Sequence, residues 1–304
     1  MKYVILFLIV TIYIFGVDIK PPNYKGKIKF IKQVELKFHF DQYGFSEISD
    51  LAYDKTKAIL YMVSDEGILY KFRAKFYNND FKLTPLNATY FKRKSGKRLR
   101  SWKRDTEGIA LDGNKNIYIS REGKPRVTQF NPNGLKIKNL KIPDSISKAK
   151  LRSKNKSLES LAYHPKYGLL TAFEWPPKGI PLHYQTIYSL KGEEWHFMME
   201  PYKKSGISEI EVMEDGNILV LERAYNGFFG KFVITLKKVY LNRCDKNKLC
   251  QSRVLLKIDS AKDWHVENFE GVTRVEKNRY LMVSDDNRNF FQQTLLIYFE
   301  IRGN

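Results

Sequence analysis

Cysteine and histidine are scarce in this 304-residue chain, which contains two cysteines and five histidines. So few thiol and imidazole groups exclude zinc-finger arrays, iron–sulfur ferredoxins and disulfide-framework toxins. The chain also lacks a Walker loop, a dinucleotide-binding fingerprint and a G-x-S-x-G nucleophile elbow. The sequence therefore gives no sign of a nucleotide-binding site of these types or of a serine nucleophile of the α/β-hydrolase type.

Acidic residues are outnumbered by basic ones. There are 33 Asp and Glu against 53 Lys and Arg, which gives a formal net charge of +20. The excess suits an anionic partner, although a lysine-rich composition alone produces the same balance. Because 43% of the residues are hydrophobic and 14% are aromatic, the chain can bury a full core, which excludes a disordered or collagen-like protein. The length accommodates two ordinary domains or one large all-β domain.

Long apolar runs are absent except for Tyr3–Phe15, which follows Lys2 and precedes Gly16. A short basic start, an apolar core and a small residue near its end are typical of a secretory signal. The run is short for a bilayer span, which needs about 20 residues. We therefore expect residues 1–17 to be a signal peptide and the mature protein to be periplasmic or secreted in a bacterium, with no transmembrane segment. An uncleaved N-terminal anchor is the alternative.

The two cysteines, Cys244 and Cys250, flank a short polar segment. In an oxidising compartment such a pair can form a local disulfide. A metal site is disfavoured, because no other cysteine or nearby histidine pair completes four ligands. We expect a disulfide, with two free thiols as the alternative.

One pattern occurs five times: a glutamate, a short apolar strand, a turn, a second apolar strand and another acid. The five leading glutamates are Glu47, Glu107, Glu159, Glu209 and Glu270. Turns such as Asp112-Gly113-Asn114 between apolar runs are typical of β-hairpins. The second strands are largely continuous apolar runs, as expected between packed sheets. They are Ile117–Ser120, Leu169–Phe173, Ile218–Leu221 and Tyr280–Val283.

The repeat spacing predicts a closed ring. Successive leading glutamates are 60, 52, 50 and 61 residues apart, close to the roughly 40–50 residues of a four-stranded propeller blade. The two chain ends together supply one more unit of similar length, so strands from both termini would complete one blade. We predict an all-β fold, a single closed β-propeller of five or six blades over residues 25–304. One short helix is expected over 145–153, and a two-sheet sandwich does not predict this repeat.

The repeated acids are predicted to meet at one end of the ring, because a hairpin returns the chain to its starting edge. Three pairs are 15 residues apart, namely Glu107/Glu122, Glu159/Glu174 and Glu270/Asp285. The pairs Glu47/Asp65 and Glu209/Glu222 are 18 and 13 apart. Crowded carboxylates must protonate, pair with arginine or bind a cation, and a set of oxygen ligands suits Ca²⁺. The alternative is that the acids are structural and bond to loop amides.

Several motifs in combination carry a resemblance to a known family. They are DTEGIA at 105–110, SLESLAY at 157–163, EDGNILVLER at 214–223, NFEG at 268–271 and SDDNRN at 284–289. Together they resemble the phytase-like family called "esterase-like activity of phytase", over about Ser46 to Phe299. The resemblance implies an exported bacterial β-propeller whose Glu and Asp residues carry phosphoesterase-type chemistry. The chain departs from the family where Arg121-Glu122 replaces a serine and an acid, and Ser120 is the alternative there.

A phosphate ester repels a carboxylate, so a divalent cation, expected to be Ca²⁺, must neutralise charge and activate water. We expect the catalytic residues to be Glu107, Glu122, Glu159, Glu174 and Glu270, with Glu122 or Glu174 as general acid or base if burial raises its pKa. The expected metal ligands are Glu47, Asp65, Glu209, Glu222, Asp285, Asp286 and Asn287. The expected phosphate-binding residues are Arg121, Lys124, Arg223 and Arg288.

The expected function is therefore a metal-dependent phosphoesterase or phosphodiesterase acting on a small anionic substrate. We expect a monomer. We also expect no specific nucleic-acid partner, because the basic run Lys92–Arg104 suits a solvated loop between blades, with binding to nucleic acid or anionic lipid headgroups as the alternative. The alternative is a non-catalytic propeller of the cell envelope that binds a ligand or a protein, since propellers serve both purposes.

Overall fold

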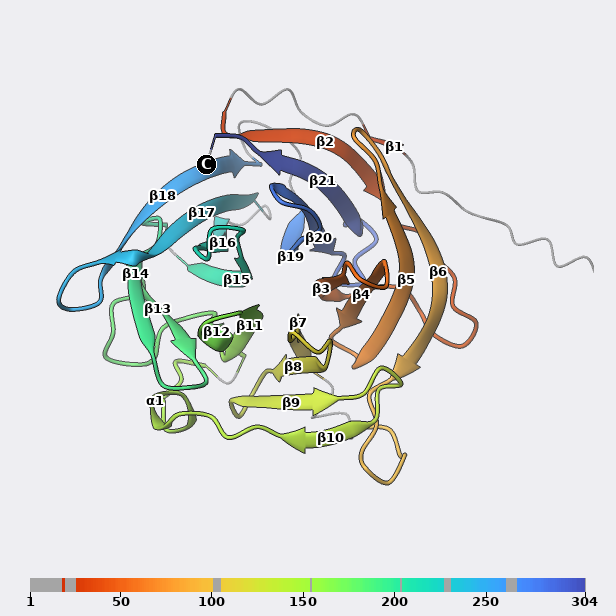
Figure 1. The fold of residues 1–304 in the computed structure, drawn as a ribbon, viewed down its shortest axis with the longest axis horizontal. Coiled ribbons are helices and arrows are strands. Elements are labelled where there is room, and N and C mark those ends of the chain that lie inside the picture. Colours follow the sequence, from red (N-terminus) through yellow and green to blue (C-terminus); the bar gives the residue numbers. More distant parts are fainter. Residues whose placement is uncertain are drawn as a thin grey trace, which may run out of the picture.

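The structure is a computed structural model that describes residues 18–19, 26–100, 105–153, 155–202, 204–226, 231–260 and 267–303. The expected signal peptide, residues 1–17, lies outside the described residues. The described chain forms five antiparallel sheets arranged as blades around a central axis (Figure 1). The predicted all-β propeller is confirmed, and the number of blades is five. No helix within the described ranges is long and apolar enough to cross a membrane.

Four blades are each built from consecutive strands, the first of which lies next to the axis. Blade 1 contains β3 (Ile48–Asp54), β4 (Ile59–Ser64), β5 (Ile68–Phe76) and β6 (Phe81–Tyr90). Blade 2 contains β7 (Thr106–Leu111), β8 (Ile117–Arg121), β9 (Arg126–Phe130) and β10 (Lys136–Asn139). Blade 3 contains β11 (Leu158–His164), β12 (Gly168–Phe173), β13 (Tyr184–Ser189) and β14 (Glu194–Met198). Blade 4 contains β15 (Ser205–Val212), β16 (Ile218–Asn226), β17 (Lys231–Cys244) and β18 (Cys250–Asp259).

Blade 5 joins the two ends of the chain. It contains β19 (Asn268–Arg274), β20 (Arg279–Asp285) and β21 (Leu295–Ile301), followed by β2 (Ile28–Glu35) and β1 (Asp18–Ile19). Strand β2 lies beside β21 (Figure 1), in a register that pairs Phe30 with Phe299. The prediction that both termini share one blade is confirmed, and this pairing closes the ring.

The predicted second strands appear as β8, β12, β16 and β20, each within a few residues of the expected bounds. The helix expected over 145–153 is a shorter one, α1 (Asp144–Ser147). The core lies between neighbouring blades. Blades 5 and 1, for example, pack Tyr298 against the rings of Phe76 and Phe81. Burial of these apolar faces from water holds the blades side by side.

The inner strands approach one another too closely for a side chain at two positions. A Cβ atom on Gly108 would lie 2.6 Å from the backbone nitrogen of Leu161 in the next blade. A Cβ atom on Gly271 would lie 2.8 Å from the Cα atom of Asp50. Glycine at these two positions lets blades 2 and 5 contact blades 3 and 1 through their backbones, which draws the surrounding acidic side chains together.

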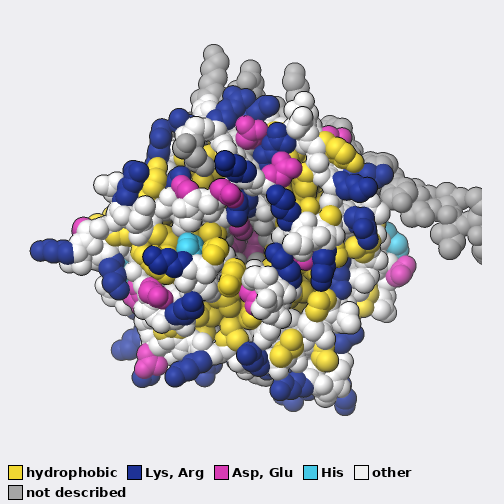
Figure 2. Space-filling model, in the orientation of Figure 1, with side chains coloured by type: hydrophobic (Ala, Val, Ile, Leu, Met, Phe, Trp, Pro, Cys, Tyr) yellow, Lys and Arg dark blue, Asp and Glu magenta, His cyan; other side chains and the backbone are white. Residues whose placement is uncertain are grey.

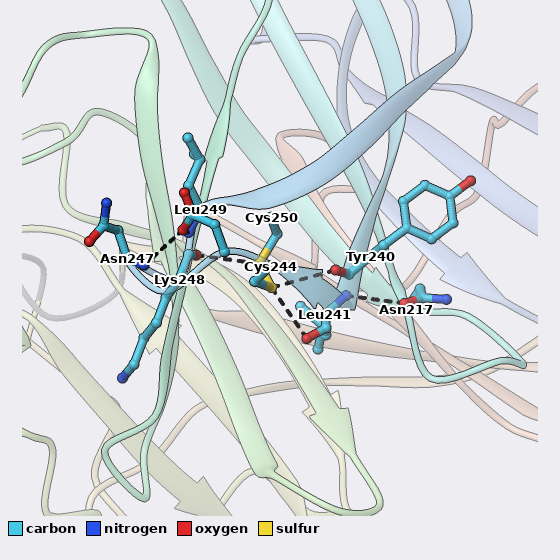
Figure 3. The surroundings of a disulfide bond; sticks show 9 residues. Asn217, Tyr240, Leu241, Cys244, Asn247, Lys248, Leu249 and Cys250 are labelled. Atoms are coloured by element: carbon cyan, nitrogen blue, oxygen red, sulfur yellow. Dashed lines mark hydrogen bonds between the residues drawn. A yellow bond between two sulfur atoms is a disulfide. The ribbon is translucent and has the colours of Figure 1, made fainter.

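The two cysteines lie at the outer side of blade 4, where a disulfide joins Cys244 to Cys250 (Figure 3). It links the adjacent ends of β17 and β18. The turn between them is held by Asp245, whose Oδ1 accepts hydrogen bonds from the backbone nitrogens of Asn247 (2.8 Å) and Leu249 (3.0 Å). The disulfide therefore fastens a β-hairpin that the chain already forms locally.

Candidate active site

An irregularity near the start of every inner strand decides which side chains meet at the mouth of the channel. In blade 3 the pairing with β12 shifts between Leu158 and Ser160, so Glu159 is the extra residue of a β-bulge. The same shift occurs in the other four blades. The residues at this bulge position are Ser49, Glu107, Glu159, Ser208 and Glu270.

A second set of side chains lies near the end of the second strand of each blade. Asp285 pairs with Asn268 just before the bulge of blade 5, and Arg223 pairs with Gly206 in blade 4. The five residues at this position are Asp65, Glu122, Glu174, Arg223 and Asp285. Together the two positions supply seven carboxylates and one guanidinium to one end of the channel. We call this end the acidic mouth and include in it Asp105 and Lys156, which are described below.

The sequence repeat aligned Glu47 with Glu107, but the structure places Glu47 at a different position of its blade. Its backbone oxygen accepts from the nitrogen of Asp65, as the oxygen of Asp105 accepts from the nitrogen of Glu122. Glu47 is therefore the counterpart of Asp105, and the counterpart of Glu107 is Ser49. The side chain of Glu47 lies at the rim, 3.0 Å from Nε of Arg288. Sequence reasoning gave Asp105 no role, although it stands in the DTEGIA motif.

Glu209 lies one residue beyond the bulge of its strand and points deeper into the channel. Its Oε1 accepts from the backbone nitrogens of Leu161 (3.0 Å) and Ile210 (2.8 Å). Asp50, in blade 1, accepts from the backbone nitrogen of Ile109 (2.7 Å). The two buried carboxyl groups hydrogen-bond to each other, and burial raises the pKa of both. A shared proton therefore joins blades 1 and 4 across the axis, so Glu209 is a structural residue rather than a member of the acidic mouth.

Three further predicted metal ligands are engaged elsewhere. Glu222 is buried, with Oε1 2.9 Å from Nζ of Lys237 and with Oε2 accepting from the backbone nitrogen of Glu200. Asp286 accepts from the backbone nitrogen of Glu47 (3.0 Å) and from the hydroxyl of Thr294 (2.9 Å). Asn287 donates to Gln292. The polar atoms of these three side chains are therefore engaged in contacts within loops and blades.

Of the four predicted phosphate-binding cations, only Arg223 lies among the acids of the mouth. Arg121 donates to Thr128 inside blade 2, and Lys124 is exposed on the following turn. Arg288 pairs with Glu47 at the rim. Ser120, the alternative to Arg121, is buried, and its Oγ accepts from the backbone nitrogen of Gly108 (2.7 Å).

One half of the acidic mouth is neutralised by basic side chains. Arg223 forms an ion pair with Glu270, and its Nη2 lies 3.7 Å from Oε1 of Glu174. Burial lowers the pKa of Arg223, but the charges of Glu270, Glu174 and Glu159 outweigh that effect and raise it. Lys156, which sequence reasoning missed, lies 2.7 and 2.6 Å from the two oxygens of Glu174. Glu174 and Glu270 therefore accept charge-assisted hydrogen bonds or ion pairs from basic side chains.

The other half contains carboxylates without such partners. Asp105, Glu107 and Glu122 can each place an oxygen so that all three lie within 4.8 Å of one another. Burial and a hydrogen bond to Asp105 raise the pKa of Glu122 to about 8. Burial and the charges of Glu159 and Asp65 raise the pKa of Glu107 well above its ordinary value. Burial and the charge of Glu270 raise the pKa values of Asp65 and Asp285 to about 8 each.

No lysine or arginine among the described residues forms an ion pair with these five carboxyl groups, Asp65, Asp105, Glu107, Glu122 and Asp285. Figure 2 shows one face of the molecule, on which basic side chains surround a few acidic side chains near the centre. Hard oxygen donors in this number suit a divalent cation such as Ca²⁺. We call Asp105, Glu107 and Glu122 the carboxylate triad, since it is the group with the closest oxygens.

A family model described as phytase-like, "esterase-like activity of phytase", matches residues 43–288. The chain belongs to this family. A search of curated protein sequences finds no match. Solved structures that resemble this phytase-like chain include a luciferin-regenerating enzyme (10% identity, 86% of this chain and 94% of that chain covered, TM-score 0.44). The PQQ-bound aldose sugar dehydrogenase of Streptomyces coelicolor matches at 11% identity, with coverage of 92% and 99% and a TM-score of 0.43. The Pan2 WD40 domain of Neurospora crassa matches at 10% identity, with coverage of 93% and 98% and a TM-score of 0.39.

Proposed function

We propose that this protein is an exported, metal-dependent phosphoesterase that binds a divalent cation, Ca²⁺ in the first instance, and a small phosphate ester at its acidic mouth. The observation that carries the proposal is the carboxylate triad, whose three oxygens lie within 4.8 Å of one another without a basic partner in the described chain. Membership of a family described by esterase-like activity of phytase supports an ester as substrate. The two halves of the mouth would then have different tasks.

The unneutralised half would hold the cation. Asp105, Glu107 and Glu122 supply the oxygens, and Asp65 is close enough for its charge to act on Glu107. A bound divalent cation supplies charge neutralisation for phosphate oxygens and lowers the pKa of a coordinated water. The raised pKa values of these carboxyl groups reflect burial and mutual repulsion. A bound cation would neutralise the repelling charges, which are otherwise neutralised by protons.

The neutralised half would handle the rest of the substrate. Burial and the charge of Glu174 raise the pKa of Glu159 well above its ordinary value, which favours the protonated form of this side chain. Glu159 is then suited to protonate the departing alkoxide as a general acid. Lys156 keeps 29% of its side chain exposed and is placed to meet a phosphate oxygen. Arg223 acts as a positioning residue, because it holds Glu174 and Glu270.

Export remains part of the proposal. A disulfide between Cys244 and Cys250 suits an oxidising compartment, and Tyr3–Phe15 has the pattern of a secretory signal. A mature N-terminus beyond residue 17 in native material supports cleavage, whereas a chain that begins at Met1 supports the retained anchor. We propose that the mature protein acts as a monomer.

The direct test is turnover of p-nitrophenyl phosphate and bis-p-nitrophenyl phosphate with Ca²⁺, Mg²⁺, Mn²⁺ or Zn²⁺ and with chelator. We expect the purified protein to hydrolyse at least one ester with Ca²⁺, to lose that activity with chelator and to regain it when Ca²⁺ is restored. If no ion supports turnover while Ca²⁺ still raises the melting temperature, the protein is a ligand-binding propeller and the proposed hydrolysis is wrong.

A further inference from the structure

The channel has a second hollow at the end opposite the acidic mouth. The inner strands all run away from that mouth, and the far ends of all five of them line one pocket. Ile109 and Leu161 belong to its lining. The same two residues donate their N–H groups to the carboxyl pair Asp50–Glu209. The buried pair therefore separates this pocket from the acidic mouth, so the pocket is not an extension of the site described above.

Small residues create the space in this pocket. Two residues beyond the level of Asp50 and Glu209, the side chains facing the axis are Ala52, Ala110, Ala162, Glu211 and Thr273. Alternate residues of a strand point to the same side of the sheet, so these five share one level. Three alanines out of five leave a hollow at the axis, with a carboxyl group in its wall.

Glu211 is the carboxyl group at that level within the described chain. Burial raises its pKa to about 8, although Arg274 and the backbone N–H groups of Arg274 and Val212 oppose the shift. Asp50, Tyr280 and Arg274 are the titratable or charged groups that face Glu211 from other strands. Glu209 precedes it on the same strand. Glu211 is therefore a poorly solvated acid that gains from a hydrogen-bond donor or a positive charge entering the hollow.

The rim of the pocket carries the opposite charge. Lys55, Lys115 and Lys277 belong to its lining, and none of the three has an ion-pair partner within the part of the chain that the structure describes. Arg274 is already paired with Glu214. Tyr53 and Tyr163 also line the pocket. A molecule that fits this arrangement has a donor at its inner end and a negative group at its outer end.

We propose that this lysine-rimmed pocket binds a small zwitterion, with an ammonium group against Glu211 and a carboxylate, sulfonate or phosphonate among Lys55, Lys115 and Lys277. The site is separate from the proposed phosphoesterase centre and does not depend on it. An ammonium group stabilises the ionised form of Glu211, so binding below pH 8 releases a proton. The affinity should accordingly rise as the pH increases from 6 to 8.

The test is calorimetric titration of the purified protein with taurine, which carries an ammonium and a sulfonate and contains no phosphate ester. Wild type should bind taurine more tightly at pH 8 than at pH 6. Glu211→Gln, which keeps the shape but removes the charge, should weaken binding about tenfold or more and abolish the pH dependence. Glu107→Gln, at the acidic mouth, is the matched control and should bind taurine as wild type does.

Ethanesulfonate and ethanolamine, which each carry one of the two charged groups, should bind much more weakly than taurine. Ala162→Leu, which fills the hollow, provides a second variant if Glu211→Gln does not fold. The proposal is overturned if wild type fails to bind taurine at millimolar concentration. It is also overturned if a folded Glu211→Gln binds taurine unchanged, or if ethanesulfonate binds as well as taurine, because the pocket then recognises only an anion.

Discussion

Replacing Glu107 with glutamine should reduce kcat/KM for the best phosphate ester by about a hundredfold or more. The substitution preserves shape but removes one charge from the carboxylate triad, and a catalytic cation contributes several kcal/mol of transition-state stabilisation. Without added cation, the same variant should melt at a higher temperature than wild type, because a buried acid that lacks a basic partner is lost. Steady-state kinetics and thermal melts with chelator measure the two effects.

A matched control separates this effect from a general loss of acidic charge. Glu194→Gln changes a half-buried glutamate on β14, which is not part of the acidic mouth, and should leave turnover and melting temperature unchanged. The account is contradicted if Glu107→Gln retains wild-type turnover, or if Glu194→Gln is as inactive as Glu107→Gln.

Calcium should stabilise the protein more at pH 8.5 than at pH 5. The folded-state pKa values of Asp65, Glu122 and Asp285 are raised to about 8 from ordinary values of 3.8 to 4.5. Between these limits the folded state binds more protons than the unfolded state, so stability without cation falls as the pH rises through 8. Calcium replaces those protons. At a concentration a hundred times its Kd it stabilises the native state by about 2.7 kcal/mol, or about 5 °C in Tm for a chain of this size.

Melting curves with and without Ca²⁺ across this pH range check the expectation. The double variant Glu107→Gln, Glu122→Gln should show a flatter pH profile and little response to Ca²⁺. An equal calcium shift at pH 5 and pH 8.5 would mean that the cation does not compete with protons on these carboxyl groups. A full calcium shift in the double variant would move the cation site away from the triad.

The architecture and part of the mouth could be predicted from the sequence because they depend on periodic features. The hairpin repeats determine the blades, and the lengths left at the two termini determine that β2 must pair with β21. Wherever acids are 15 residues apart, as in Glu107/Glu122, a hairpin of constant length brings both to one edge. Such regularities follow from local pairing alone.

The remaining site residues depend on single-residue shifts that hydrophobic patterning does not show. Every inner strand contains the bulge, but Glu209 stands one residue beyond it, and a shift of one residue turns a side chain to the other face of a strand. Glu209 therefore contacts Asp50 instead of the mouth. The pairs Glu47/Asp65 and Glu209/Glu222 are 18 and 13 residues apart, whereas the other three pairs are 15 apart. This difference was the sign in the sequence that Glu47 and Glu209 occupy other positions. The partners of Glu222 and Arg121, namely Lys237 and Thr128, are set by packing within blades and have no signature in the spacing.

The most direct test of the central claim is a crystal structure of the full protein grown at pH 8 with Ca²⁺, in which the cation is located by its anomalous scattering. We predict one calcium ion bound by carboxyl oxygens of Asp105, Glu107 and Glu122, with Arg223 still paired to Glu270. A calcium ion bound only elsewhere, or a triad that holds none while its carboxyl groups hydrogen-bond to one another, would contradict the account.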